Sequence, residues 1–501
     1  MDLIHRKGRP CGINKRHRGT RLKLPALASL ANTGAGIFCR LTAFLLTPVF
    51  TRIMTKEALG EYSLFTTSLG IISTLGSLEL SGGVLFSLLS DNREGERDLL
   101  RAALLTVVTI TALLSLPSSY FYYRASGVKS LLLPAALLVC AVSRVTLLLY
   151  NGQSRYRYRY RVPTLLSLTE ALIPPATSLL LFKRAGASSL GIVRCLCLSA
   201  VLVALALPCA VGLLKRGGVP SPSCKDALEK RGAVGANRMR ILHYIKIILA
   251  TTLPTLPYFI SVSLISSLDK VVIATRLGGV RLAEYSVAQA LGSGISMLTS
   301  GAGAALTPWI IRKFKSGKSA EISGLVGMLS KIIPLGSLLL LTASPELFRL
   351  LAPSGYQTAI GVVYAVSLGA LPLFLSGCCF AIIICTKKAR LPSMLSLIPA
   401  ALSLMINLVL IGRGGIIVSA VSLVISYTAL YLTLSFSLRK IIGNSPVNDA
   451  SCLQITLLCA VISSLLYLSR DIIIVRAIAA VAIIACLIPT LIRLMKLVRE
   501  E

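Results

Sequence analysis

The segment YQTAIGVVYAVSLGALPLFLSGCCFAIIICT, residues 356–386, has no charged side chain at any of its 31 positions. A helix crosses the hydrocarbon core of a bilayer with about 20 mostly apolar residues. The rest of the chain is similar, because 55% of its 501 residues are hydrophobic and only 14% are charged. Soluble domains carry about 25% charged residues. We therefore expect an all-α polytopic membrane protein, and the composition excludes a soluble fold.

Fourteen segments after residue 24 are apolar and long enough to span a bilayer. The expected spans are residues 25–50, 62–90, 101–123, 128–150, 164–183, 187–214, 244–268, 280–308, 322–345, 356–386, 391–412, 414–438, 451–469 and 471–493. The first is too long for a cleavable signal, whose apolar region has 7–15 residues, so we expect it to be retained.

The distribution of basic residues predicts how the chain is oriented. The formal net charge is +33, which in a soluble protein would suggest nucleic acid. With the N-terminal tail placed in the cytoplasm, 34 Lys and Arg fall in inside segments and 13 in outside gaps. This bias predicts a protein of the cell membrane with both termini cytoplasmic and with no nucleic-acid partner. The loop RYRYRYR, residues 155–161, is explained most simply by anionic lipid head groups, and recruitment of an anionic lipid-linked substrate is the alternative.

The two halves of the chain share a short motif. RIMTKEALGEYS at 52–63 and TRLGGVRLAEYS at 275–286 have Leu-x-Glu-Tyr-Ser in common at an offset of 223. Six spans per half give both copies the same orientation, as in transporters with parallel repeats. We expect two six-helix lobes around a central cavity and two additional C-terminal helices. The expected divisions are a basic tail (1–24), an N-lobe (25–214), a cytoplasmic linker (215–243), a C-lobe (244–438), and a C-terminal helix pair with tail (439–501).

Two longer stretches connect the chain with a known family. ANTGAGIFCRLTAFLLTPVFTRIMTKEALGEYSLF at 31–65 and SSLDKVVIATRLGGVRLAEYSVAQAL at 266–291 resemble the first and the seventh-to-eighth span regions of oligosaccharide flippases. These belong to the polysaccharide biosynthesis transporter family, within the multidrug/oligosaccharidyl-lipid/polysaccharide exporter superfamily. The resemblance implies alternating-access transfer of a polyprenyl-diphosphate-linked oligosaccharide to the outer leaflet. It also implies contact with membrane lipids, and glycan polymerases or glycosyltransferases as possible partners.

Arg40 is the first candidate for binding the substrate. It follows Leu24 by sixteen residues, which at 1.5 Å per residue places it about 24 Å along the first helix, deep in the membrane. Thr33, Gly36 and Thr47 share its helical face and form a small, polar stripe. A guanidinium can bind a diphosphate bidentately. The alternative is a structural pair with an acidic neighbour.

Glu79 in the second span is the expected acidic partner of Arg40. It would orient the arginine, take up a proton or cation during transport, or simply form a helix-to-helix hydrogen bond. Arg144 and Glu170 lie at matching depth in the fourth and fifth spans, where we expect a structural ion pair.

Other charged residues also lie within spans or at their outer ends. Arg194 and Lys331 are too far inside their spans to reach the interface easily, so both are further cavity candidates. Asp269, Lys270 and Arg276 cluster at the outer end of the seventh span, and Arg52 closes the first span on the same side. These four would contribute to an exit gate that holds or releases phosphate, although a hydrated loop requires no such role.

The sequence lacks the motifs of ATP-binding, metal-binding and haem-binding sites. GKS at 317–319 has Arg312 where a phosphate-binding loop requires glycine, so we expect no ATP site. His5, His17 and His243 lie in or beside cytoplasmic segments, and the thirteen cysteines lack the spacing of a metal or haem site. We expect no enzyme activity, no cofactor and no metal.

Three other functions remain open. A cation-coupled exporter of drugs or metabolites should bury acidic residues for its cargo, whereas the buried charges here are mostly basic. A glycan-polymerising or ligating membrane enzyme would usually have a large outer loop, but no outer gap exceeds about a dozen residues. The third is a non-transporting scaffold for a glycan-assembly complex.

Overall fold

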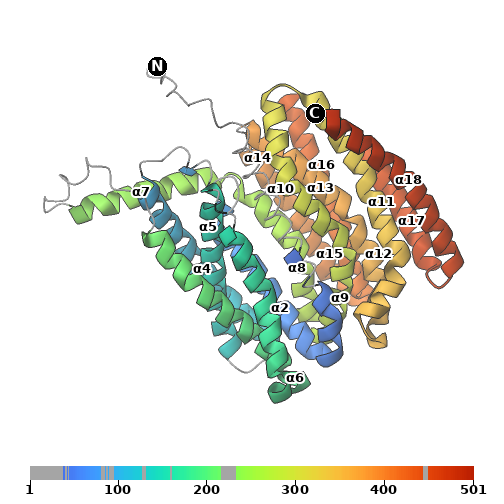
Figure 1. Cartoon of the computed structure of the whole chain (residues 1–501), viewed down its shortest axis with the longest axis horizontal. Coiled ribbons are helices and arrows are strands. Elements are labelled where there is room, and N and C mark those ends of the chain that lie inside the picture. Colours follow the sequence, from blue (N-terminus) through green and yellow to red (C-terminus); the bar gives the residue numbers. More distant parts are fainter. Residues whose placement is uncertain are drawn as a thin grey trace.

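The protein is a helical membrane protein whose helices form two bundles side by side (Figure 1). The computed structural model describes residues 38–39, 42, 44–80, 85, 88–89, 95–126, 131–157, 159, 161–215, 233–386, 388–443 and 449–500.

The first bundle contains four long helices. They are α2 (Lys56–Ser77), α4 (Glu96–Ser126), α5 (Leu132–Tyr156) and α6 (Arg161–Lys215). The longest, α6, is a pair of helices joined at a kink, because Gly186 has a left-handed φ of 78° that few other residues adopt. A further helix, α7 (Ala233–Thr252), runs across one end of this bundle, roughly perpendicular to it (Figure 1).

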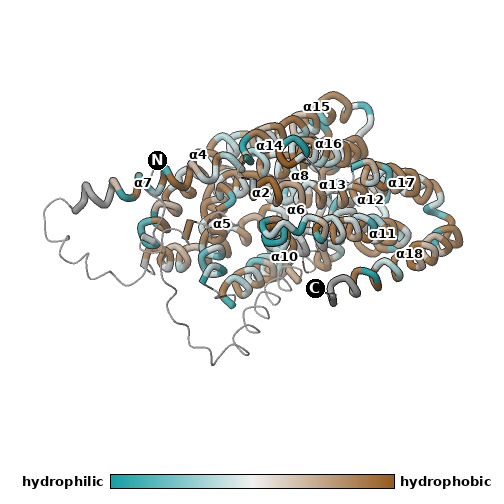
Figure 2. The backbone as a smooth tube through the Cα atoms, turned by 90° about the horizontal axis from the view of Figure 1, so that it is seen from above, coloured by the Kyte–Doolittle hydropathy of each residue, from teal (hydrophilic) through white to brown (hydrophobic). Residues whose placement is uncertain are grey.

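The second bundle contains the described chain from α8 onward. Its elements are α8 (Leu256–Arg276), α9 (Gly279–Gly292), α10 (Gly294–Lys315), α11 (Ser319–Leu351), η4 (Ser354–Ala359), α12 (Ile360–Leu368), α13 (Ala370–Cys385), α14 (Arg390–Leu395), α15 (Leu397–Gly414), α16 (Ile416–Ile442), α17 (Asp449–Leu468) and α18 (Ile473–Glu500). Hydrophobic residues predominate along the outer helices α15, α17 and α18 (Figure 2). Large apolar side chains on α17 and α18 are exposed, as suits contact with lipid.

Within the described residues, eleven segments are long and apolar enough to cross a membrane. They match the third to sixth and the ninth to fourteenth expected spans to within a few residues. The seventh span is displaced, because the structure places it at Leu256–Arg276 and not at residues 244–268. A turn at residues 253–255 separates it from α7, where Pro254 cannot donate the hydrogen bond that would continue the helix.

Three expected spans are not among these eleven segments. Most of the first, residues 25–50, lies outside the described residues, which show a helix at Phe44–Ile53. In the second, α2 ends at Ser77, and Leu78 and Glu79 then have positive φ angles of 49° and 53°. Such angles are uncommon for residues other than glycine. The eighth is divided at Ser293 into α9 and α10.

An ion pair attaches the C-terminal helices to the second bundle. Arg476 of α18 is 7% exposed, and both of its terminal nitrogens lie 2.6 Å from the carboxylate oxygens of Glu346 on α11. Arg476 also donates to the carbonyl of Thr342 at 2.9 Å. This forked geometry fixes the position of α18 along α11.

The two copies of the Leu-x-Glu-Tyr-Ser motif bring the bundles together. The helices α2 and α9 begin at Lys56 and Gly279, and 279 minus 56 is again 223. The hydroxyl oxygens of Ser63 and Ser286 lie 2.5 Å apart, so equivalent positions of the repeat touch. A Cβ atom on Gly60 would lie 2.0 Å from the carbonyl oxygen of Gly279, so the backbones approach closely. We call this contact between α2 and α9 the seam.

A buried ion pair closes the seam. Lys56 Nζ lies 2.6 Å from Glu284 Oε1 and 2.6 Å from the carbonyl oxygen of Gly355. Arg281 binds the second oxygen of Glu284 at 2.9 Å. The Glu284 side chain is 4% exposed and that of Lys56 30%. The carboxylate that joins the bundles is therefore almost completely removed from solvent.

Candidate functional site

A cavity of about 300 Å³ lies between the two bundles. Its walls come from the helix at Phe44–Ile53, from α2, from both halves of α6 and from α9, together with Cys39. Because both bundles contribute, a movement of one bundle against the other changes the shape of the cavity.

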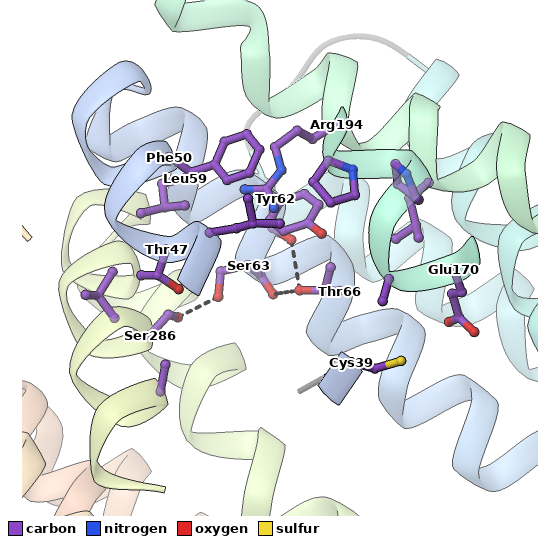
Figure 3. A pocket seen from close by; sticks show the side chains of 17 residues that line it. Cys39, Thr47, Phe50, Leu59, Tyr62, Ser63, Thr66, Glu170, Arg194 and Ser286 are labelled. Atoms are coloured by element: carbon purple, nitrogen blue, oxygen red, sulfur yellow. Dashed lines mark hydrogen bonds between the residues drawn. The ribbon is translucent and has the colours of Figure 1, made fainter. Parts of the chain in front are cut away.

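Arg194, from the second half of α6, is the cation in this cavity. Its guanidinium carbon lies 3.5 Å from the centre of the Phe50 ring and 3.8 Å from that of Tyr62 (Figure 3). Its Nη1 also approaches the sulfur of Met54 at 3.7 Å. Two aromatic faces stabilise a desolvated cation by about 2 kcal/mol or more. No carboxylate lies within ion-pair distance of it in the part of the chain that the structure describes, so its charge is available to an anion.

Hydroxyl groups line the wall at the seam. Ser63 and Ser286 contribute one hydroxyl from each bundle, and Thr47 and Thr66 lie beside them (Figure 3). Thr66 donates to the carbonyls of Tyr62 at 3.0 Å and of Ser63 at 3.1 Å. The seam thus forms one wall of the cavity as well as the contact between bundles.

The first half of α6 forms a different wall. Glu170 lies on it, apart from Thr47, Ser63 and Ser286 in the view of Figure 3. Oε1 of Glu170 lies 3.3 Å from Nη1 of Arg144 on α5. This ion pair confirms the expected pair between the fourth and fifth spans. The carboxylate in this cavity is therefore already neutralised by a cation from the same bundle.

The expected pair of Arg40 and Glu79 stays a prediction. Arg40 lies outside the described residues, although the side chain of its neighbour Cys39 lines the cavity. Glu79 lies at the break after α2, away from the lining residues, and its backbone N–H donates to Ser77 Oγ at 3.4 Å.

The expected exit-gate residues differ in how deeply they are buried. Asp269 is 1% exposed and accepts hydrogen bonds from the Tyr285 hydroxyl and from Gln289 Nε2, the latter at 3.3 Å. Lys270 is half-buried, whereas Arg276 is exposed at the end of α8. A role for these residues in release stays a prediction.

The other two candidates also lie away from the cavity lining. Arg52 donates to the carbonyl of Pro48 at 2.9 Å and to that of Leu350 at 3.0 Å, which ties the first bundle to the end of α11. Lys331 is exposed on α11. Their proposed contact with a substrate is not tested by this geometry.

Four residues that matter in the structure were not among the sequence candidates. Phe50 and Tyr62 enclose Arg194, and Lys56 and Glu284 close the seam. The signal for three of them was present, because Lys56, Tyr62 and Glu284 all lie in the repeated motif. A comparison of the charged positions in the two copies of the motif could have identified these residues as candidates.

Residues 29–314 match the family model described as polysaccharide biosynthesis protein, which is more than half of the chain. A search of curated proteins found no match. Among solved structures, the chain is similar to the lipid II flippase MurJ in an inward closed conformation, with a TM-score of 0.62 and 13% identity over 94% of this chain and 99% of that chain. It is also similar to an outward-facing MATE multidrug transporter of the MOP superfamily, with a TM-score of 0.56 and 14% identity over 85% of this chain and 98% of the other. At such identities the likeness shows the fold.

Proposed function

The chain belongs to the polysaccharide biosynthesis protein family, and from this membership we propose that it is a flippase for a polyprenyl-diphosphate-linked oligosaccharide. The observation that carries the proposal is Arg194, a cation without a carboxylate partner in the described residues, held at a cavity between two bundles. A diphosphate supplies oxygens that a guanidinium binds bidentately. The solved MurJ structure of the same fold is titled a lipid II flippase, which supports a lipid-linked cargo.

The seam supports an alternating-access cycle. We place α7 and both chain ends on the cytoplasmic side, following the excess of basic residues there. The seam then lies toward the outer leaflet, since Figure 1 shows α7 and α9 at opposite ends of the bundles. Cargo would enter while the seam is closed and leave after the bundles part at the seam. The prenyl tail would stay in lipid throughout.

The competing proposal is a cation-coupled exporter, which the likeness to the MATE transporter supports. The charges in the cavity favour an anion. Its lining contains Arg194, which has no acidic partner among the described residues, and Glu170, which is paired with Arg144. A cationic cargo would have to compete with Arg144 and approach Arg194, and both interactions are unfavourable at low dielectric.

The test is transfer of a labelled polyprenyl-diphosphate glycan in vesicles that contain the purified protein. An added enzyme reports how much glycan reaches the outer face. We expect Arg194→Gln to slow transfer about tenfold to a hundredfold, because hydrogen bonds to charged groups contribute about 1.5–3 kcal/mol. Arg40→Gln should have an effect of similar size if Arg40 also contacts the diphosphate.

Arg413→Gln is the matched control, because it removes an exposed arginine at the end of α15. It should transfer glycan at the wild-type rate. Transfer by Arg194→Gln at that same rate would remove the anion site from the proposal. Movement of organic cations in place of the glycan would favour the exporter.

A further inference from the structure

Two consecutive prolines interrupt the hydrogen bonding of α6 where it lines the cavity. Pro174 and Pro175 lie inside the helix, and both are among the lining residues. Proline has no backbone N–H, so the carbonyl four residues earlier loses its helical donor. The two carbonyls concerned belong to Glu170 and Ala171, which also line the cavity.

Helix geometry places the residues that carry these carbonyls on the cavity side. Residues four apart lie on the same face of a helix, so Glu170 is directly below Pro174, and Ala171 below Pro175. The opposite face of this part of α6 carries exposed apolar side chains such as Leu165, Leu172 and Leu180. Neighbouring side-chain donors go to other carbonyls of the helix, as Cys39 does to Ser167 at 3.3 Å and Ser178 to Pro175 at 2.8 Å.

Backbone acceptors that have lost their regular helical donor are unusual at membrane depth. A carbonyl without a donor is costly in hydrocarbon, and broken backbone is tolerated there where it lines a cavity that holds water or ligand. The Glu170 carboxylate adds a further acceptor on the same wall, with Arg144 bound to one of its oxygens. This wall therefore presents acceptors, whereas Arg194 presents donors and positive charge.

We propose that the Pro174–Pro175 wall of α6 is a sugar-binding subsite, in which the carbonyls of Glu170 and Ala171 accept hydrogen bonds from hydroxyl groups of the glycan. The inference rests on the proposed function and deepens it. The diphosphate binds at Arg194 and the first sugars bind at the acceptor wall, so one cavity recognises both parts of the head group. Prolines at these positions keep the acceptors free for the cargo.

The test compares two probes with purified protein in lipid nanodiscs. One is farnesyl diphosphate, and the other is the same diphosphate bearing a disaccharide. Pro174→Ala with Pro175→Ala gives both carbonyls their helical N–H donors. This change restores helix hydrogen bonds, so it should not unfold the protein. Pro208→Ala is the matched control, because Pro208 lies in the same helix, is exposed and is absent from the cavity lining.

We expect the double variant to bind the disaccharide probe about tenfold more weakly, the size expected for two neutral hydrogen bonds, and to bind farnesyl diphosphate as the wild type does. Pro208→Ala should change neither affinity. An unchanged preference for the disaccharide probe in the double variant would overturn the subsite alone. If sodium strengthens farnesyl diphosphate binding in the wild type but not in the double variant, and the sugar preference is intact, the acceptors bind a cation and the sugar subsite is overturned. Failure of the wild type to bind either probe would overturn the proposed cargo and the subsite with it.

Discussion

The two copies of the Leu-x-Glu-Tyr-Ser motif occupy equivalent places in the two bundles but make different contacts. In the first copy, Tyr62 lies against the guanidinium of Arg194 in the cavity. In the second, the Tyr285 hydroxyl donates to the buried carboxylate of Asp269 inside the second bundle. One motif therefore lines the cavity in one half and packs internally in the other. The comparison shows that identical tyrosines of the two copies make different contacts, although the helices that carry them meet at equivalent positions.

The glutamates of the two copies differ more strongly. Glu284 is bound by Lys56, whereas a side-chain oxygen of its counterpart Glu61 is buried and has no hydrogen-bond partner in the part of the chain that the structure describes. The repeat explains why. The position equivalent to Lys56 in the second copy is Gly279, which has no side chain to pair with Glu61. The seam is thus closed by an ion pair on one side of the repeat axis alone.

Reversing the charge of Lys56 should have the largest effect on this asymmetry. Lys56→Glu would leave Glu284 facing a second carboxylate. Breaking a buried pair costs about 3–5 kcal/mol, and we expect about 2 kcal/mol here because the Lys56 side chain is 30% exposed. The measurement is hydrogen–deuterium exchange of peptides that cover residues 52–65 and 278–291. Exchange should rise in both peptides.

The charge swap Lys56→Glu with Glu284→Lys should restore slow exchange in part, because Arg281 and the carbonyl of Gly355 would still lose their present partners. Glu321→Gln is the control, because it also breaks ion pairs of a carboxylate. The partners of Glu321, Lys313 and Lys318, lie within the second bundle. If exchange at the seam stays at the wild-type level in Lys56→Glu, the ion pair does not hold the bundles together.

A methyl group at the centre of the seam should have the next largest effect. In Gly60→Ala, the new Cβ would lie 2.0 Å from the Gly279 carbonyl, so the two backbones must separate. Such overpacking costs about 1–3 kcal/mol, and we expect a lower thermal unfolding midpoint. The control Gly70→Ala lies in the same helix with no atom within 4 Å of its Cβ, and it should be neutral or slightly stabilising. Equal midpoints for both variants would contradict the close contact.

Adding a cation that can pair with Glu61 should have the smallest effect. Gly279→Lys places a lysine at the position equivalent to Lys56, and its Cβ has room because the nearest atom, the carbonyl oxygen of Glu57, is 3.8 Å away. By the symmetry of the repeat, this lysine should reach Glu61 and stabilise the closed seam by about 0.5 kcal/mol. A double-mutant cycle with Glu61→Gln measures the coupling from unfolding midpoints. A coupling of zero would mean that the symmetry does not extend to this pair.

The sequence predicted the features that depend on local composition. Long apolar segments such as residues 451–469 and 471–493 appear as α17 and α18, because length and hydropathy decide whether a helix can span a bilayer. The pair of Arg144 and Glu170 was predicted from depth alone and is confirmed. The expected bounds of the seventh span, residues 244–268, were wrong because an apolar run is compatible both with a span and with a helix such as α7. Pro254 separates the two helices.

The details of the site depend on contacts between distant segments. Arg194 was recognisable as an unusual charge within a span, but nothing in the sequence shows that Phe50 and Tyr62 enclose it. Asp269 was predicted to belong to a gate from its place near the end of a span. Its burial follows from Tyr285 and Gln289, four residues apart on one face of α9, which no local pattern in α8 reveals.

The ion pair between Arg476 and Glu346 also links the C-terminal helices to any movement of the second bundle. The main contacts of α17 and α18 are with α11 and α12 of the second bundle, so these helices travel with that bundle. In the proposed cycle, each opening of the seam would push this pair of lipid-facing helices sideways through the surrounding acyl chains. Lipid viscosity would then oppose that movement, and a stiffer membrane would slow transfer without any change in the cavity.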